Sequence, residues 1–440
     1  MDRYSGKQVF LLVVITLTGI ISSFVLNQPL AIGFLPGFFY LIFLGWKKGV
    51  SFKEIRKISY IGVKRIKVVL FILFFVSFLL PSWYLSGTIN EMVSVTMEAI
   101  DPQHFFVLSF LTTMLFSMIT GTSLGTLSAL GIPLISTAIL MGLPIEVTAG
   151  AVISGAFVGD RTSPFSGTHQ LLSRVLEISV RKQGKAMLLT TIIGIAAAVL
   201  FYRFMDVQFS TELQSSPNKE SNQSITFIPF IPPLLLIVPV LFRIDIIKSF
   251  LFSILSASVI AIYDGHTLFK IANAYWKGID SLGGGLLHMY GLLVFIALAG
   301  AYNSLLEDLN IIQPLLNKWL HSSRSMVSDS VKTTIATLMV SLMAANQTMP
   351  IILTGRSFLA HWTSKYSKEE LARVMGDTTM LFPAIVPWNV LAILASTIIS
   401  MPLGDYLPYA VFLWFLPCLT IIVSMFKKGR SYDSKYKAVS

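Results

Sequence analysis

The sequence has little charge and almost no cysteine. Of its 440 residues, 12% are charged and 54% are hydrophobic, whereas soluble domains carry about 25% charged residues. This composition excludes an ordinary soluble domain and indicates a helical chain that crosses a membrane several times. The single cysteine, Cys418, excludes a disulfide framework and a cysteine metal site.

Signatures of enzymatic chemistry are also missing. The sequence holds no G-x-x-x-x-G-K-[ST] loop, no nucleophile elbow and no His/Cys cluster with metal-ligand spacing. We therefore expect neither an enzyme nor a bound cofactor. A net charge of +11 would suit a nucleic-acid partner, but the basic residues lie in short loops beside apolar runs. That distribution is typical of the positive-inside rule and indicates a lipid bilayer instead.

The apolar runs predict an all-α polytopic membrane protein with about ten to twelve transmembrane helices. Residues 47–67 contain eight basic residues and one acid, so they are predicted to be cytoplasmic and to place the N-terminus of this cell-membrane protein inside. The same segment could bind anionic lipid, although a role in topology is favoured. The basic tail from Lys427 predicts that the C-terminus is inside as well. Residues 206–226 are polar and predicted to be external, which divides the chain into halves 1–205 and 227–440.

An apolar run beginning at Ala149 leads directly into Gly159-Asp160-Arg161-Thr162-Ser163-Pro164. An aspartate at the centre of a spanning helix costs about 2.5–3.5 kcal/mol on insertion, so Asp160 indicates a protein-lined cavity with a function. The alternative is that Asp160 lies at the membrane surface and caps the next helix, because Asp before Thr-Ser-Pro suits a cap. This stretch alone favours neither interpretation.

Residues 121–126, GTSLGT, lie between two half-length apolar runs. Such a segment suggests a helix broken in mid-membrane, whose freed carbonyls and hydroxyls could coordinate a cation. The favoured alternative is close helix packing through the small-xxx-small pair Gly121 and Gly125.

The second half repeats both features. Gly376-Asp377 resembles Gly159-Asp160, and the polar interruption 346–350 resembles 121–126 at nearly the same separation along the chain. Corresponding broken segments in two halves predict two inverted repeats with broken or re-entrant helices, and a transport site at their interface.

Five motifs occur in one order along the chain: WYLSGTIN (83–90), GTSLGT (121–126), AGAVISGAFVGDRTSP (149–164), GRSF (355–358) and PWN (387–389). As a set they resemble the NhaC-type Na⁺/H⁺ antiporters, within the superfamily of broken-helix ion transporters. The resemblance implies Na⁺/H⁺ antiport by alternating access or, as in some relatives, sodium-coupled exchange of small carboxylates. One position departs from the family pattern, because Gly167 stands where an acid usually precedes paired threonines, and His169 replaces the second threonine. If that acid binds sodium, this chain has altered coupling or another solute.

We therefore predict that Na⁺ and H⁺ compete for the carboxylates of Asp160 and Asp377. In the alternative function, a carrier of a small organic carboxylate or amino acid, Arg161 or Arg356 would pair with the substrate. His169 is an accessory candidate for carrying a proton, although a plain helix-end histidine is favoured. A scaffold or receptor is disfavoured by the paired Gly-Asp motifs, and a homodimer stays open. The polar residues predicted to support the two carboxylates are Thr122, Ser123, Thr126, Ser163, Asn346 and Asn389.

Overall fold

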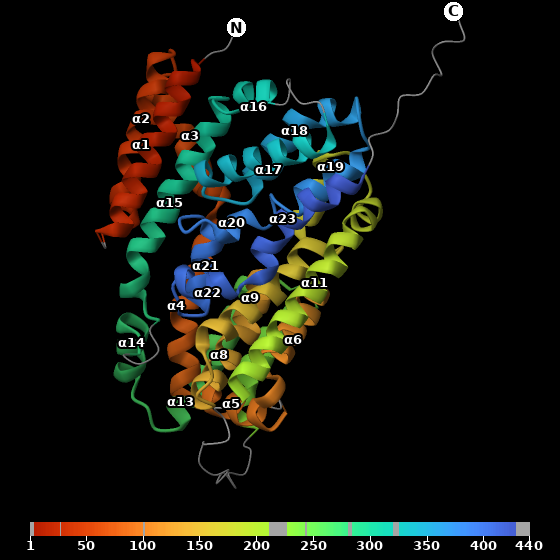
Figure 1. Cartoon of the computed structure of the whole chain (residues 1–440). Helices are drawn as coiled ribbons and strands as arrows, with labels where there is room; N and C mark the ends of the chain where they lie inside the picture. Colours follow the sequence, from red (N-terminus) through yellow and green to blue (C-terminus); the bar gives the residue numbers. More distant parts are fainter. Residues whose placement is uncertain are drawn as a thin grey trace, which may run out of the picture.

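The computed structural model describes residues 4–26, 28–99, 102–210, 227–242, 244–279, 284–319 and 325–427. Helices make up almost all of this part of the chain (Figure 1). Apolar chains in lipid fold this way because every backbone N–H and C=O must find its partner within the protein. The predicted all-α polytopic class is confirmed.

Seven helical segments in the described residues are long and apolar enough to cross a membrane. A pair of helices bent by 85° supplies an eighth candidate, and three shorter apolar segments bring the total into the predicted range. The long segments are α1 (Gly6–Val25), α2 (Leu30–Lys47), α4 (Lys67–Leu85), Ser123–Leu140, α11 (Val180–Ser210), α13 (Ile246–Tyr263) and α15 (Leu286–Asp308). The bent pair begins with α21 (Val390–Ile398), and the shorter segments are α6 (Phe105–Thr120), Ile228–Leu241 with α12 (Ile231–Leu241), and α23 (Val411–Phe426).

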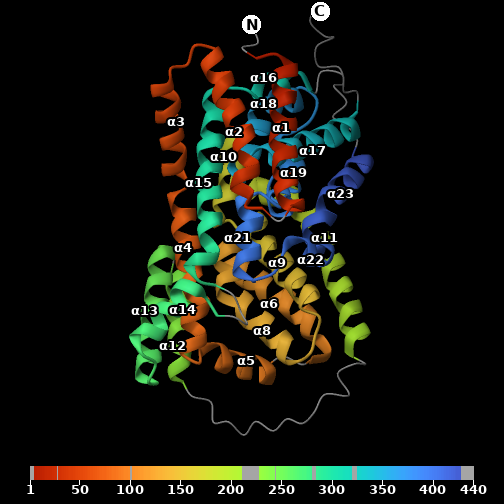
Figure 2. The same ribbon diagram turned by 90° about the vertical axis from the view of Figure 1, so that its left-hand side faces the viewer.

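Two groups of helices approach the middle of the molecule from opposite ends. In Figures 1 and 2, α6, α8 and α9 occupy the lower half, and α17, α18 and α19 occupy the upper half. In the lower group, residues 121–122 form a short non-helical segment between α6 and the helix that begins at Ser123. In the upper group, residues 344–347 form such a segment between α17 and α18. This is the inverted arrangement of broken helices that the sequence predicts. The bounds are α7 (Ser123–Thr126), α8 (Ile132–Leu140), α9 (Ile145–Thr162), α10 (Gly167–Val175), α17 (Met326–Met343), α18 (Thr348–Thr363), α19 (Lys368–Gly376) and α20 (Phe382–Ile385); between α7 and α8 the chain forms a π-helical turn, Leu127–Gly131.

Gly121 ends α6 and makes the first break. Its φ of 71° lies in the left-handed region, which glycine adopts without steric cost. A Cβ at this position would also collide with the backbone of Phe165 and Ser166, in the connection between α9 and α10. The helix is therefore broken at residues 121–122, and the close packing that the small residues favour also occurs, between Gly121 and the segment that follows Asp160.

Helix α11 extends into the first residues of the segment 206–226, which the sequence predicts to be external. Asp206 still belongs to α11, which continues to Ser210. Its buried carboxylate accepts hydrogen bonds from the backbone nitrogens of Phe106 (2.8 Å) and Val107 (3.2 Å) at the start of α6. A carboxylate is favourable at a helix N-terminus, so this contact holds the end of α11 against α6. Residues 211–226 lie outside the described part of the chain.

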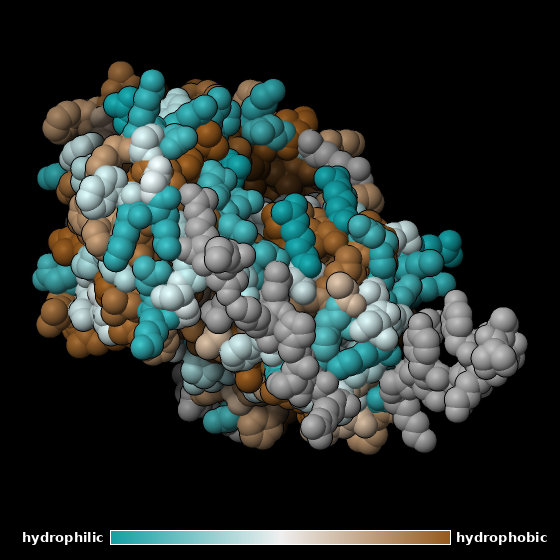
Figure 3. All heavy atoms as spheres, turned by 90° about the horizontal axis from the view of Figure 1, so that it is seen from above, coloured by the Kyte–Doolittle hydropathy of each residue, from teal (hydrophilic) through white to brown (hydrophobic). Residues whose placement is uncertain are grey.

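The start of α1 and the end of α23 lie at the same end of the molecule (Figure 1). Seen from above, this end carries many hydrophilic side chains, with hydrophobic ones between them and in a hollow of the surface (Figure 3). The basic helix α3 (Phe52–Arg65) also begins at this end (Figure 2). The remaining helices are α5 (Thr88–Ala99), α14 (Leu268–Lys277), α16 (Gln313–Trp319) and α22 (Leu403–Tyr406).

Candidate ion site

Asp160 lies in the last turn of α9, is 8% exposed and is surrounded by uncharged polar groups. Its Oδ1 lies 3.4 Å from the Ser166 hydroxyl and 3.3 Å from the Thr168 hydroxyl, and each hydroxyl shares its one proton between this atom and the Asp160 backbone oxygen. Its Oδ2 accepts a hydrogen bond from Nε2 of Gln347 (3.3 Å), and the Ser123 side chain lies near the carboxylate. No ion pair to Asp160 occurs among the described residues. The buried charge is thus compensated by dipoles alone.

The connection between α9 and α10 folds back over the end of α9. Ser166 caps α10 by accepting a hydrogen bond from the His169 nitrogen (3.2 Å), and its hydroxyl donates to the backbone oxygen of Asp160 (2.5 Å). The Thr168 hydroxyl donates to the same oxygen at 3.1 Å. Both hydroxyls are held beside the Asp160 carboxylate by this capping geometry.

Gln347 brings the second repeat to the same carboxylate. It lies at the end of the break between α17 and α18, and its Nε2 also donates to the backbone oxygen of Met380 (2.8 Å). Asp160 is therefore contacted from both repeats. Carboxylate, hydroxyl, amide and carbonyl oxygens are the ligand atoms that hard cations prefer.

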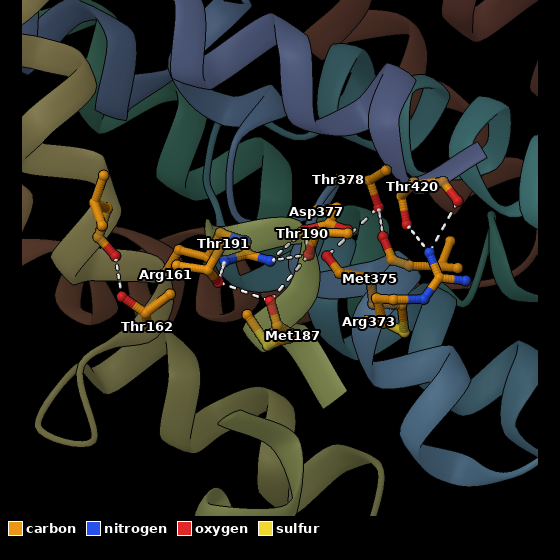
Figure 4. A network of polar contacts seen from close by, with 12 residues as sticks. Arg161, Thr162, Met187, Thr190, Thr191, Arg373, Met375, Asp377, Thr378 and Thr420 are labelled. Atoms are coloured by element: carbon orange, nitrogen blue, oxygen red, sulfur yellow. Dashed lines mark hydrogen bonds and ion pairs between the residues drawn. The ribbon is translucent and has the colours of Figure 1, made fainter. Parts of the chain in front are cut away.

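Asp377 has a different environment (Figure 4). It follows α19, is fully buried, and forms an ion pair with Arg161, which is also fully buried. The Thr190 hydroxyl donates to Asp377 (3.1 Å), and Arg161 donates to the hydroxyls of Thr190 (2.9 Å) and Thr191 (2.6 Å). Arg161, the residue next to Asp160, thus neutralises Asp377, which the sequence predicts as the second sodium ligand. This ion pair joins α9 to the end of α19, and Thr190 and Thr191 of α11 bond to it.

The other predicted polar residues mainly hold the helix breaks in shape. The Asn389 side chain accepts from the Leu391 nitrogen (3.1 Å) and donates to the Ala344 oxygen (3.1 Å), tying α21 to the second break. The Ser163 hydroxyl donates to the Met118 oxygen (2.8 Å) near the first break. Thr122, Thr126 and Asn346 similarly bond backbone groups of their own segments. Of the six supporting residues, Ser123 is the one whose side chain lies near the Asp160 carboxylate.

Two accessory candidates, His169 and Arg356, do not contact Asp160. His169 is buried, and its Nδ1 lies 2.7 Å from the backbone oxygen of Arg161, which fits the favoured structural role. Arg356 is exposed on α18. At Gly167, no atom lies within 4 Å of the place that a Cβ would take. The fold would therefore accept a larger side chain at this position.

A cavity of about 500 Å³ lies beside the site. It is lined by Leu124 after the first break and by Asn346 and Gln347 of the second. Arg65 and Glu307, joined by an ion pair of 2.8 Å and partly exposed, also line it. One water occupies about 30 Å³ of liquid, so the cavity can hold a hydrated ion next to Gln347.

Sequence reasoning missed Gln347, Ser166 and Thr168 as contacts of Asp160. A signal was present for each: Gln347 stands in the Asn-Gln-Thr interruption, and the hydroxyls follow Pro164 closely. Which of these side chains face Asp160 depends on how the connection folds back, and hydropathy does not encode that.

A model of the Na⁺/H⁺ antiporter family matches residues 171–428. The Na⁺/H⁺ antiporter NhaC of Bacillus subtilis is 27% identical over 403 residues, which cover 86% of this chain and 88% of that protein. The NhaC antiporter of Alkalihalophilus pseudofirmus is 25% identical and covers 82% of each chain. The malate-2H⁺/Na⁺-lactate antiporter of Bacillus subtilis is 24% identical, over 87% of this chain and 86% of that protein. These relatives are membrane transporters.

Proposed function

Because the chain belongs to the Na⁺/H⁺ antiporter family, we propose that it exchanges Na⁺ for H⁺ across the cell membrane, with Asp160 as the carboxylate that both ions share. The environment of Asp160 supports this role, since a buried carboxylate without a cationic partner is stabilised by a proton or by a bound cation. The two cannot occupy the same oxygen atoms together. Each ion therefore displaces the other, and this competition couples their movements.

The side chains that contact Asp160 come from both repeats, and this supports alternating access. Ser166 and Thr168 belong to the first repeat, whereas Gln347 belongs to the second. Movement of one repeat against the other would separate these groups and expose Asp160 to one side of the membrane at a time. The buried pair of Arg161 and Asp377 gives the repeats a contact without net charge during this movement.

In the membrane, we place the end that carries α3 and both described chain ends in the cytoplasm, because it bears the basic segment 47–67. Na⁺ and H⁺ are the transported ions, and the exchange needs no resident cofactor. The halves 1–205 and 227–440 and a homodimer stay predictions.

A second candidate function is exchange of a small organic anion, and the size of the cavity favours it. About 500 Å³ exceeds the need of a single ion. Arg161 is paired with Asp377, and Arg356 is exposed on α18. Arg65 lines this cavity and would therefore be the arginine that pairs with the organic anion. Na⁺/H⁺ exchange by the purified chain without any organic solute would exclude this function as the sole activity.

The test is Asp160→Asn in everted membrane vesicles, with a pH-sensitive dye reporting proton movement on addition of Na⁺. We expect the sodium-dependent signal to disappear. Glu177→Gln is the control, because Glu177 is an exposed acid just after α10 that pairs with Lys368 at 2.9 Å. The hydrogen bond from Lys368 lowers the Glu177 pKa, so at neutral pH this variant also removes one negative charge. Normal exchange by Asp160→Asn would remove Asp160 from the mechanism.

A second measurement separates binding from turnover. When Na⁺ is added to purified wild-type protein in weakly buffered detergent, protons should be released as Na⁺ replaces them. Asp160→Asn should release none, whereas Glu177→Gln should match the wild type. Equal release from both variants would contradict a shared carboxylate at Asp160.

A further inference from the structure

The cavity beside the ion site carries one cation and one anion on its wall. Of the residues that line it, the charged ones are Arg65, at the end of α3, and Glu307, in the last turn of α15. Nη1 of Arg65 lies 2.8 Å from Oε2 of Glu307, and the two side chains are 54% and 38% exposed. Their charges cancel, so an anion that enters the cavity meets a cation that already has a counter-charge. The wall therefore gives little electrostatic advantage to a ligand with a net charge.

The pair leaves donor and acceptor atoms free for a ligand. Nη1 of Arg65 and Oε2 of Glu307 form the only hydrogen bond of these two side chains in the part of the chain that the structure describes. A guanidinium carries further N–H donors, and a carboxylate has a second acceptor oxygen. A ligand carboxylate can therefore bind Arg65 while a ligand ammonium group donates to Oε1 of Glu307. Because the two side chains are in contact, both ligand groups can stand on one carbon atom, as they do in an α-amino acid.

Uncharged polar groups line the same cavity and are more deeply buried. Ser304 of α15 is 3% exposed, and its hydroxyl has no hydrogen-bond partner among the described residues. Buried hydroxyls usually have a partner, so this one is available to a polar group in the cavity. Gln347 lies on the opposite wall and donates to Asp160. A ligand in the cavity would thus lie beside the side chain that connects it to the ion site.

Most of the remaining wall is apolar. It includes side chains of four segments of the chain, among them Val69, Leu124, Ile352, Leu391 and Leu394. An apolar wall favours a ligand whose uncharged part is hydrocarbon. The volume of about 500 Å³ lies within the range of about 300–1,000 Å³ that is typical of pockets for small organic ligands.

We propose that this cavity binds an α-amino acid with an apolar side chain, with the carboxylate on Arg65 and the ammonium group on Glu307. The proposal rests on the second candidate function, in which the chain carries an organic solute, and it replaces the anion with a zwitterion. A zwitterion has no net charge and matches the balanced wall, whereas an organic acid would bring its carboxylate close to that of Glu307. The side chain of the amino acid would lie against the apolar wall.

The test is isothermal titration calorimetry of the purified full-length protein in detergent and saturating Na⁺. The ligands are leucine, 4-methylpentanoate, which is leucine without its ammonium group, and 3-methylbutylamine, which is leucine without its carboxylate. We expect leucine to bind at least about tenfold more tightly than either analogue, because each analogue loses a hydrogen bond to a charged group. Equal affinity for leucine and 4-methylpentanoate would overturn the proposal, and so would an absence of binding by leucine, valine and methionine.

Two variants assign the charges of the ligand to their partners. Glu307→Gln should remove the preference for leucine over 4-methylpentanoate, and Arg65→Gln should remove the preference for leucine over 3-methylbutylamine. If the ion pair only supports the structure, each variant should instead weaken all three ligands in parallel, which would contradict the assignment. Glu177→Gln is the matched control, because it removes one acid from an exposed ion pair outside the cavity and should leave all three affinities unchanged.

Proton release on addition of Na⁺, measured on the same preparation, separates this proposal from the role of Asp160. If protons are released but no amino acid binds, the amino-acid site is wrong and the shared carboxylate stands. If leucine binds with the expected preferences but no protons are released, the shared carboxylate is wrong and the amino-acid site stands.

Discussion

Asp160 and Asp377 follow a glycine in corresponding places of the two halves, yet the protein surrounds them differently. Asp377 has a guanidinium partner, whereas Asp160 has hydroxyls and one amide. A carboxylate bound to a buried arginine is already neutralised, so a cation gains little by approaching it. A carboxylate compensated only by dipoles keeps its attraction for a proton or a cation. From this comparison we propose that the repeats have divided two tasks, with ion binding at Asp160 and attachment of the repeats at Asp377.

The largest expected effect concerns stability. Asp377→Asn leaves Arg161 charged, buried and without its partner, which typically costs about 3–5 kcal/mol. Asp160→Asn leaves no buried charge unpaired and should unfold near the wild-type temperature. Thermal unfolding in detergent, followed by tryptophan fluorescence, measures both.

Replacing both members of the pair sharpens this prediction. Arg161→Leu combined with Asp377→Leu removes the unpaired charge and should recover much of the lost stability. If Asp160→Asn were the less stable single variant, the assignment of the two tasks would be reversed.

A smaller effect is expected at Gln347, which connects Asp160 to the second repeat. Gln347→Ala removes a hydrogen bond to a charged group, about 1.5–3 kcal/mol, so the apparent KM for Na⁺ should rise about tenfold or more. Gln170→Ala is the control, because Gln170 bonds the Pro164 oxygen and does not contact Asp160. Equal KM values for the two variants would show that the cross-repeat contact has no part in binding.

The smallest expected effect is on the KM for Na⁺, and it distinguishes a residue that faces Asp160 from one that stabilises a helix break. Thr168→Val keeps the shape of the side chain but removes the hydroxyl, and a typical hydrogen bond of about 0.5–1.5 kcal/mol predicts a KM increase of a few fold. Ser163→Ala removes a bond to the Met118 oxygen instead. It should lower the unfolding temperature slightly and leave the KM for Na⁺ unchanged. Titration of Na⁺ in the vesicle exchange assay measures the KM of both variants.

Much of the fold could be predicted because hydrocarbon imposes strict rules on composition. Long apolar runs give spans, and glycine with hydroxyls at 121–126 marks a place where a helix ends. The site was predicted less completely. Asp160 stands out because a charge in an apolar run is rare, but Gln347 and Thr168 do not, since uncharged polar residues occur throughout the chain.

The sequence alone determined that this is a polytopic helical protein, that its two halves carry related breaks, and that Asp160 and Asp377 are the acids near them. Only the tertiary structure decided which acid is neutralised. Consecutive residues of a helix point about 100° apart, so Asp160 and Arg161 face different neighbours although they are adjacent in the chain. Which neighbours these are depends on the packing of α9 against α19 and the second break, and no local pattern records that packing.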